Sequence, residues 1–118
     1  MDKRKGAKFI KIDFKNREET VIQNFYDGEG ALSARMFLDG DNRILYGTLA
    51  LGASIGLHRH TDNCEIIYIL EGEGRALYDG AEEELQTGDC HYCPRGHSHS
   101  LINSGDGNLV FFAAVPRQ

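Results

Sequence analysis

Two histidines, His58 and His60, lie one residue apart in the segment HRHTDNCE, and Glu65 follows the second by five positions. Alternate residues of a β-strand point to the same side, so a strand here would project both imidazoles into one space. The connector at 61–64 is rich in turn-forming residues, which predicts that the chain reverses and brings Glu65 beside the imidazoles on the neighbouring strand. The spacing therefore predicts three ligands for one metal ion. Taken alone, a His-x-His pair on a strand is more often a solvated pair.

A second polar segment, GDCHYCPRGHSHSLIN at 88–103, offers a fourth ligand. Pro94 and Gly96 predict a turn before a strand that begins near Ser98, and on that strand His99 and Leu101 share one face. Three imidazoles and a carboxylate supply nitrogen and hard oxygen donors without thiolates. Such a set suits Mn, Fe, Co, Ni, Zn or Cu. We therefore expect a divalent transition metal ion with open coordination positions.

Other side chains are candidates for supporting roles. His97, two residues before His99, is interpreted as an extra ligand, a hydrogen-bonding neighbour of a ligand, a proton shuttle or a solvated turn residue. His91, His97 and Tyr46 are candidates for a general base. An anionic ligand could be oriented by guanidinium groups or by a phenol hydroxyl, and the candidates are Arg35, Tyr46, Arg59 and Arg75. Each of them, taken singly, is more often a solvated strand residue.

The cysteines number three, Cys64, Cys90 and Cys93. An odd number in a chain with enough apolar residues for a core indicates reduced thiols and a cytoplasmic protein. Three-residue spacing on a strand sends Cys90 and Cys93 to opposite faces, which argues against a redox pair. The side chain of Cys64 is expected to point to the strand face opposite to Glu65, so its expected role is packing.

Short apolar segments separated by glycine-containing turns must position these residues. The turn signals DGDN, EGEG, DG, TGD and SGDG predict hairpins. Many short strands indicate a sandwich or barrel, and closure removes free edges. We expect an all-β jelly-roll barrel with strands at these segments: 8–13, 21–26, 32–38, 43–51, 55–60, 65–70, 75–78, 83–86, 90–93, 98–102 and 109–115.

The segment 65–70 has apolar residues on both faces. Ile67 and Ile69 share the parity of Glu65, whereas Ile66, Tyr68 and Leu70 point the other way. A second sheet or a second subunit is expected to cover the outer face.

Length and charge exclude several classes of protein. The 118 residues suit one domain, 1–118, and contain 13 Lys and Arg against 18 Asp and Glu, a net charge of −5 that disfavours nucleic acid. No apolar run approaches the roughly 20 residues needed to span a bilayer. The basic start of the chain lacks the apolar stretch of a secretory signal, which again indicates the cytoplasm.

The two polar segments resemble the two conserved motifs of the cupin superfamily. Positions of the first motif are matched by Gly52, His58, His60, Glu65 and Gly72, and those of the second by Gly88, Pro94, Gly96, His99 and Asn103. Fifteen residues separate Gly72 from Gly88, the short spacing of small prokaryotic cupins. The resemblance covers residues 52–103.

The resemblance implies a double-stranded β-helix with a metal held by His58, His60, Glu65 and His99. It also implies a homodimer, often with N-terminal strands exchanged, for which residues 8–26 are the candidates. Cupins include dioxygenases, decarboxylases, isomerases and binding proteins. We expect a metal-dependent enzyme acting on a small, anionic, chelating organic acid; the alternative is a non-catalytic module that binds or senses a small molecule.

Overall fold

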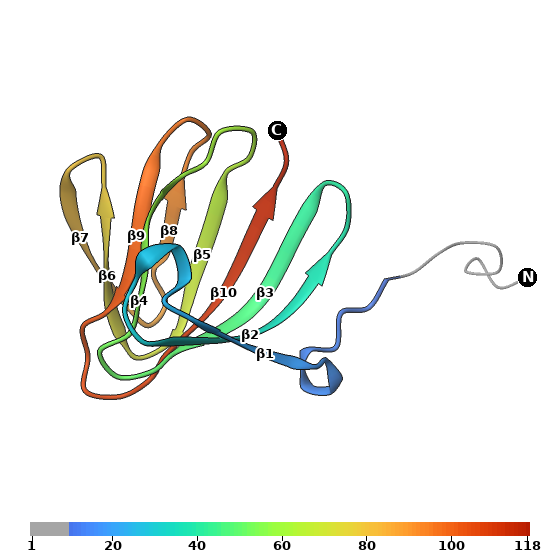
Figure 1. Ribbon diagram of the computed structural model, residues 1–118, viewed down its shortest axis with the longest axis horizontal. Coiled ribbons are helices and arrows are strands. Elements are labelled where there is room, and N and C mark those ends of the chain that lie inside the picture. Colours follow the sequence, from blue (N-terminus) through green and yellow to red (C-terminus); the bar gives the residue numbers. More distant parts are fainter. Residues whose placement is uncertain (1–9) are drawn as a thin grey trace, which may run out of the picture.

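The computed structural model describes residues 10–118 (Figure 1). This part of the chain has ten strands, two three-residue 3₁₀ helices and no α-helix. The strands are β1 (Glu19–Gln23), β2 (Ala31–Leu38), β3 (Asn42–Leu49), β4 (Ser54–Arg59), β5 (Glu65–Glu71), β6 (Glu73–Tyr78), β7 (Ala81–Gln86), β8 (Cys90–Cys93), β9 (Ser98–Asn103) and β10 (Leu109–Pro116). The 3₁₀ helices are η1 (Phe14–Asn16) and η2 (Phe25–Asp27).

The strands form two antiparallel sheets whose inner faces pack on each other. One sheet has six strands in the order β1-β2-β3-β10-β5-β8, and the other has four in the order β4-β9-β6-β7. Leu49, Ile69, Leu101 and Phe111 are fully buried between them. The prediction of an all-β jelly roll is confirmed. Nine of the predicted strand segments match β2–β10 closely.

The turn signals have two different outcomes. DGDN at 39–42 and DG at 79–80 close the hairpins β2–β3 and β6–β7, as predicted. The other three join strands of different sheets, so the prediction that they close hairpins is wrong. At EGEG, Gly72 has φ +87°, and a Cβ there would overlap the carbonyl oxygen of Asn108. A glycine signal marks a sharp turn, but burial of the flanking strands decides which sheet the chain enters next.

The N-terminal segment differs from the prediction at two places. Residues 10–13 form no strand, and the rest of the expected strand at 8–13 lies outside the described residues. The segment expected at 21–26 corresponds to β1, which ends at Gln23 because Asn24, Tyr26 and Asp27 adopt left-handed backbone conformations (φ 52°, 53° and 63°). β1 pairs with β2 of the same chain.

The two faces of β5 differ as predicted. Ile67 and Ile69 are buried in the core, whereas Ile66, Tyr68 and Leu70 are 37%, 42% and 39% exposed. The six-stranded sheet therefore keeps apolar side chains on its outer face. Over residues 10–118, no helix has the length and apolar character needed to cross a bilayer.

Candidate metal centre

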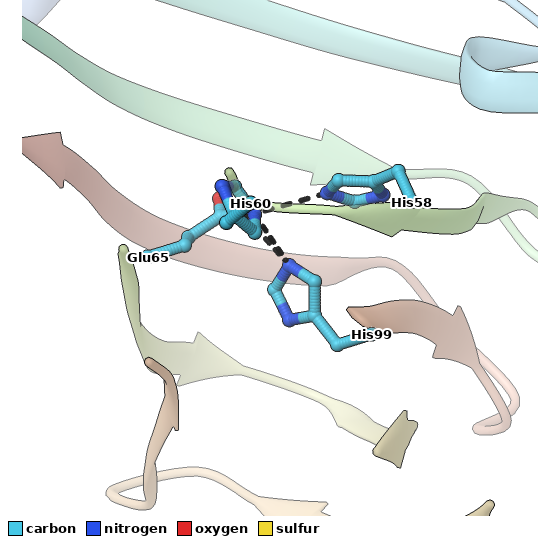
Figure 2. Close-up of side chains that lie close together, drawn as sticks. All are labelled: His58, His60, Glu65 and His99. Carbon is cyan, nitrogen blue, oxygen red and sulfur yellow. Dashed lines mark hydrogen bonds and ion pairs between the residues drawn. The ribbon is translucent and has the colours of Figure 1, made fainter. Parts of the chain in front are cut away.

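The four predicted ligands come together between the two sheets (Figure 2). His58 on β4 lies opposite His99 on β9, and His60 follows β4 directly. Glu65 opens β5, which belongs to the other sheet and pairs with β10 and β8. The prediction that Glu65 lies on the strand next to the imidazoles is therefore wrong. It reaches them from across the barrel, because the connector at 61–64 carries the chain from one sheet to the other.

The distances in the cluster suit ligands of one ion. Nε2 of His60 and of His99 lie 3.2 and 2.9 Å from Oε1 of Glu65, and 3.0 Å from each other. Nε2 of His58 lies 3.7 Å from the same oxygen. All four candidate donor atoms lie within 4.8 Å of one another. Donors bound at about 2.1 Å and at right angles are about 3.0 Å apart, which is the spacing of the three closest atoms.

The outer ring nitrogens show which atoms face the centre of the cluster. Nδ1 of His58 lies 2.8 Å from the carbonyl oxygen of Gly56, and Nδ1 of His60 lies 2.5 Å from Oδ1 of Asn63. Both oxygens only accept hydrogen bonds, so both Nδ1 atoms carry the proton, and a neutral ring then directs its Nε2 lone pair inward. Lone pairs of two imidazoles thus converge on the Glu65 carboxylate. Such a donor set fits a divalent cation.

Burial and mutual contacts set the charges of the cluster. Burial alone would raise the pKa of Glu65, but in the absence of a metal the hydrogen bonds and positive charge of protonated imidazoles outweigh this and hold the pKa well below the usual value. Burial lowers the pKa of His99. For His60 burial also acts downward, but Glu65 and Asn63 outweigh it and raise the pKa. We therefore describe Glu65 as ionised, His99 as neutral, and His60 as the ligand at which a proton competes best with a metal.

A cavity of about 420 Å³ opens onto His58 and His60. Arg43 and Arg59 line it, and Nε of Arg43 is buried with no hydrogen-bond partner among the described residues. Sequence reasoning missed Arg43, although its parity on β3 matches that of the buried Leu45 and Leu49 and so directs it inward. The cavity thus presents a cation beside the candidate metal ligands.

Two of the other predicted arginines do not reach this cavity. Arg35 donates to the carbonyl oxygen of Arg17 at 2.7 Å and pairs with Glu19. Arg75 pairs with Glu82 at 3.1 Å on the outside of the four-stranded sheet. Of the four predicted anion partners, only Arg59 lines the cavity.

The side chains of two of the three candidate general bases, His97 and Tyr46, make their contacts outside the cluster. His97 lies 2.7 Å from Oδ2 of Asp79 and stacks on Tyr78. Tyr46 points outward from β3 and lies beside Phe14, with the ring centroids 6.0 Å apart. By contrast, His91 is buried and its Nε2 lies 3.0 Å from Nδ1 of His99.

An aromatic residue that sequence reasoning did not assign to the site covers one ligand. Tyr26, in η2, stacks on His58 with the ring centroids 4.1 Å apart and the planes at 11°. The segment reaches this position because Gly28 and Gly56 let the backbones of η2 and β4 touch. A Cβ on Gly28 would overlap the carbonyl oxygen of Ser54, and a Cβ on Gly56 would overlap that of Tyr26. These glycines were the available sequence signal.

A jelly roll with three imidazoles and a carboxylate gathered between its sheets defines a barrel of the cupin type with a candidate metal centre. The model of the cupin domain family matches residues 45–115, which include both sequence motifs. The chain belongs to the cupin family.

Two curated relatives share part of the sequence. An oxalate-binding protein of Thermotoga maritima is 41% identical over 64 residues, which are 54% of this chain and 53% of the relative. An uncharacterized protein of Methanocaldococcus jannaschii is 38% identical over 56 residues, 48% of this chain and 45% of the relative. The matched segments thus span about half the length of these relatives.

Solved structures share the fold. A predicted oxalate decarboxylase from Thermotoga maritima superposes with a TM-score of 0.86 at 29% identity, covering 92% of this chain and 100% of the other. A cupin 2 conserved barrel protein from Salinispora arenicola, at 23% identity, covers 92% and 88% with a TM-score of 0.69, a likeness of fold alone.

Proposed function

We propose that His58, His60, Glu65 and His99 bind one divalent transition metal ion, drawn from Mn, Fe, Co, Ni, Zn and Cu. The observation that carries the proposal is the convergence of imidazole nitrogens on a buried carboxylate, with Nε2 of His60 and of His99 at 3.2 and 2.9 Å from Oε1 of Glu65. Without a metal ion or a proton between them, the lone pairs on these nitrogens would repel one another and the carboxylate. A bound metal would supply Lewis acidity or oxygen activation at coordination positions that the protein leaves open.

We further propose that the ligand is a small organic dianion of the oxalate type. A cavity of about 420 Å³ suits a ligand of this size. One carboxylate would reach the metal between His58 and His60, while the guanidinium of Arg43 would pair with the anion and give its buried Nε a partner. The similarity to an oxalate-binding protein supports this choice of ligand.

A binding experiment tests the ligand and the role of Arg43 together. Calorimetric titration of oxalate into Mn-loaded protein should give saturable binding that the metal-free protein lacks. Arg43→Gln should weaken the affinity about tenfold or more, because it removes a charge-assisted pair worth roughly 1.5–3 kcal/mol. Arg75→Gln is the matched control, since this arginine lies on the exterior, and it should leave the affinity unchanged. Equal oxalate affinity with and without metal would refute the proposal.

The site supports two outcomes after binding. As a metal-dependent enzyme, the protein would act as a decarboxylase, dioxygenase or isomerase, which the similarity to a predicted oxalate decarboxylase favours. As a binding or sensing module it would hold the acid unchanged, which the positions of His97 and Tyr46 away from the cluster favour. Metal-dependent release of carbon dioxide or uptake of oxygen during incubation with small oxo- and hydroxy-acids would identify an enzyme; saturable binding with unchanged acid would identify a module.

We also propose that the protein forms a homodimer through the outer face of the six-stranded sheet. This face exposes large apolar side chains on three of its strands, namely Tyr46, Ile66, Tyr68, Leu70 and Tyr92. Light scattering should give twice the mass of the chain, and Tyr68→Asp should reduce it to the mass of one chain. Exchange of residues 8–26 between subunits and a cytoplasmic location stay predictions.

A further inference from the structure

A chain of hydrogen bonds leads from the candidate metal centre to the protein surface. Nδ1 of His99 lies 3.0 Å from Nε2 of His91, and Nδ1 of His91 lies 2.9 Å from Oε1 of Glu83. The two imidazole planes are 15° from parallel. Both rings are 1% exposed, whereas the Glu83 side chain is 52% exposed.

This series of hydrogen bonds links strands of different sheets. His91 lies on β8, the last strand of the six-stranded sheet, and Glu83 on β7, the last strand of the four-stranded sheet. His91 therefore bridges the two sheets, since its ring nitrogens contact Glu83 on β7 and His99 on β9. Neither His91 nor Glu83 lines the cavity that opens onto His58 and His60. His91 and Glu83 thus contact the metal-binding cluster through His99 and would not contact a small molecule bound in that cavity.

The surface carboxylate fixes the direction of the hydrogen bonds. Ionised Glu83 only accepts, so Nδ1 of His91 must carry a proton. A His91 ring that carries only this proton has a lone pair at Nε2, and its contact with His99 then requires a proton on Nδ1 of His99. His99 is left with its lone pair on Nε2, the atom 2.9 Å from Glu65. The same tautomer of His99 is the one that binds a metal through Nε2.

We propose that Glu83 and His91 are positioning residues that hold His99 in the metal-binding tautomer and increase its strength as a ligand. This inference rests on the proposed metal site and adds two residues to it. A hydrogen bond from the outer nitrogen of a ligating imidazole fixes its orientation and increases its basicity. Here the acceptor is a second imidazole backed by a carboxylate, whereas the acceptors for His58 and His60 are the neutral oxygens of Gly56 and Asn63.

Zinc affinity, measured by competition with a chromophoric chelator, tests the effect on binding. His91→Phe keeps the ring and removes the hydrogen bonds, and it should weaken zinc binding about 10- to 100-fold. Glu83→Gln keeps an acceptor but removes the charge, and it should weaken binding by a smaller factor. Glu84→Gln is the matched control on the opposite face of β7 and should have no effect. Wild-type affinity in both Glu83→Gln and His91→Phe would overturn the proposal.

The tautomer of His99 gives a second readout that needs no metal. In ¹⁵N spectra of the metal-free wild-type protein, Nδ1 of His99 should be protonated and Nε2 unprotonated. His91→Phe should convert this single tautomer into a mixture. Protonation of Nε2 of His99, or of both nitrogens of His91, in the wild type would overturn the assignment. A wild-type protein with the expected tautomer but no affinity for zinc would refute the metal site, whereas the hydrogen bonds from Glu83 through His91 to His99 would stand.

Discussion

The phenol ring of Tyr26 stacks on the imidazole of His58, with centroids 4.1 Å apart and planes 11° from parallel. Tyr26 holds this position with φ +53°, a conformation that is unfavourable for a residue with a side chain. The contact must offset that cost. Aromatic stacking contributes about 0.5–1.5 kcal/mol beyond burial.

Removal of this ring should destabilise the protein. We expect Tyr26→Ala to lower the free energy of unfolding by roughly 1 kcal/mol, the stacking contribution, whereas Tyr26→Phe should be close to wild type because it keeps the ring. Urea unfolding of both variants measures this difference. Equal loss in the two variants would show that the hydroxyl, and not the stacking, stabilises the segment.

Gly56 controls the position of that segment. A Cβ at Gly56 would overlap the carbonyl oxygen of Tyr26. Gly56→Ala should therefore push η2 away from β4, lower the free energy of unfolding by about 1–3 kcal/mol and disturb His58, whose Nδ1 bonds the Gly56 carbonyl. Thermal unfolding and metal affinity should both change.

Gly107 provides the matched control for this substitution. It has no neighbour within 4 Å of an added Cβ and no positive φ. Gly107→Ala should leave both the unfolding temperature and the metal affinity at wild-type values. If Gly56→Ala behaves in the same way, the close approach of η2 and β4 is wrong.

The three thiols should differ in reactivity. Burial raises the pKa of Cys93 to about 11, and Cys93 and Cys64 are 0% and 2% exposed. Cys90 is exposed on the opposite face of β8. In the Tyr68→Asp variant, whose outer sheet face is not covered by a second subunit, a maleimide dye should therefore label the folded protein at a single position, and adding Cys90→Ser should abolish labelling. Rapid labelling of Cys93 would contradict its placement in the core.

Metal affinity should depend on pH. The pKa of His60 is raised above its usual 6.5, and its proton must leave before Nε2 can bind a metal. The apparent affinity should therefore fall as the pH falls below that raised pKa, by up to about tenfold per unit for one displaced proton. Zinc titrations between pH 8 and pH 5.5 measure this change. A constant affinity over that range would exclude His60 as a ligand.

Strand parity predicted much of the architecture and the identity of the cluster. Alternation on β5 placed Glu65, Ile67 and Ile69 on the inner face, and spacing on β9 placed His99 there. The same rule, applied to β3, would also have directed Arg43 inward and Tyr46 outward. Local periodicity thus determines which face a side chain occupies.

The sequence predicted less well which strands pair with one another. EGEG and DG are both glycine turns, yet only DG closes a hairpin, because exchange between sheets depends on the whole core. For the same reason Glu65 approaches the imidazoles from the opposite sheet. The contact of His91 with Glu83 joins strands of different sheets with no shared period, and local pattern gives no signal for it. For the contact of Tyr26 with His58, Gly28 and Gly56 indicate a close approach of backbones but do not identify the partner.

Metal content is the most direct test of the account. Protein loaded with manganese or zinc and then desalted should retain about one ion per chain by elemental analysis. His60→Ala and His99→Ala should each retain a small fraction of that amount, while His97→Ala, whose histidine pairs with Asp79 outside the cluster, should retain all of it. Full stoichiometry in His60→Ala and His99→Ala, or no retained ion in the wild type, would contradict the proposed centre.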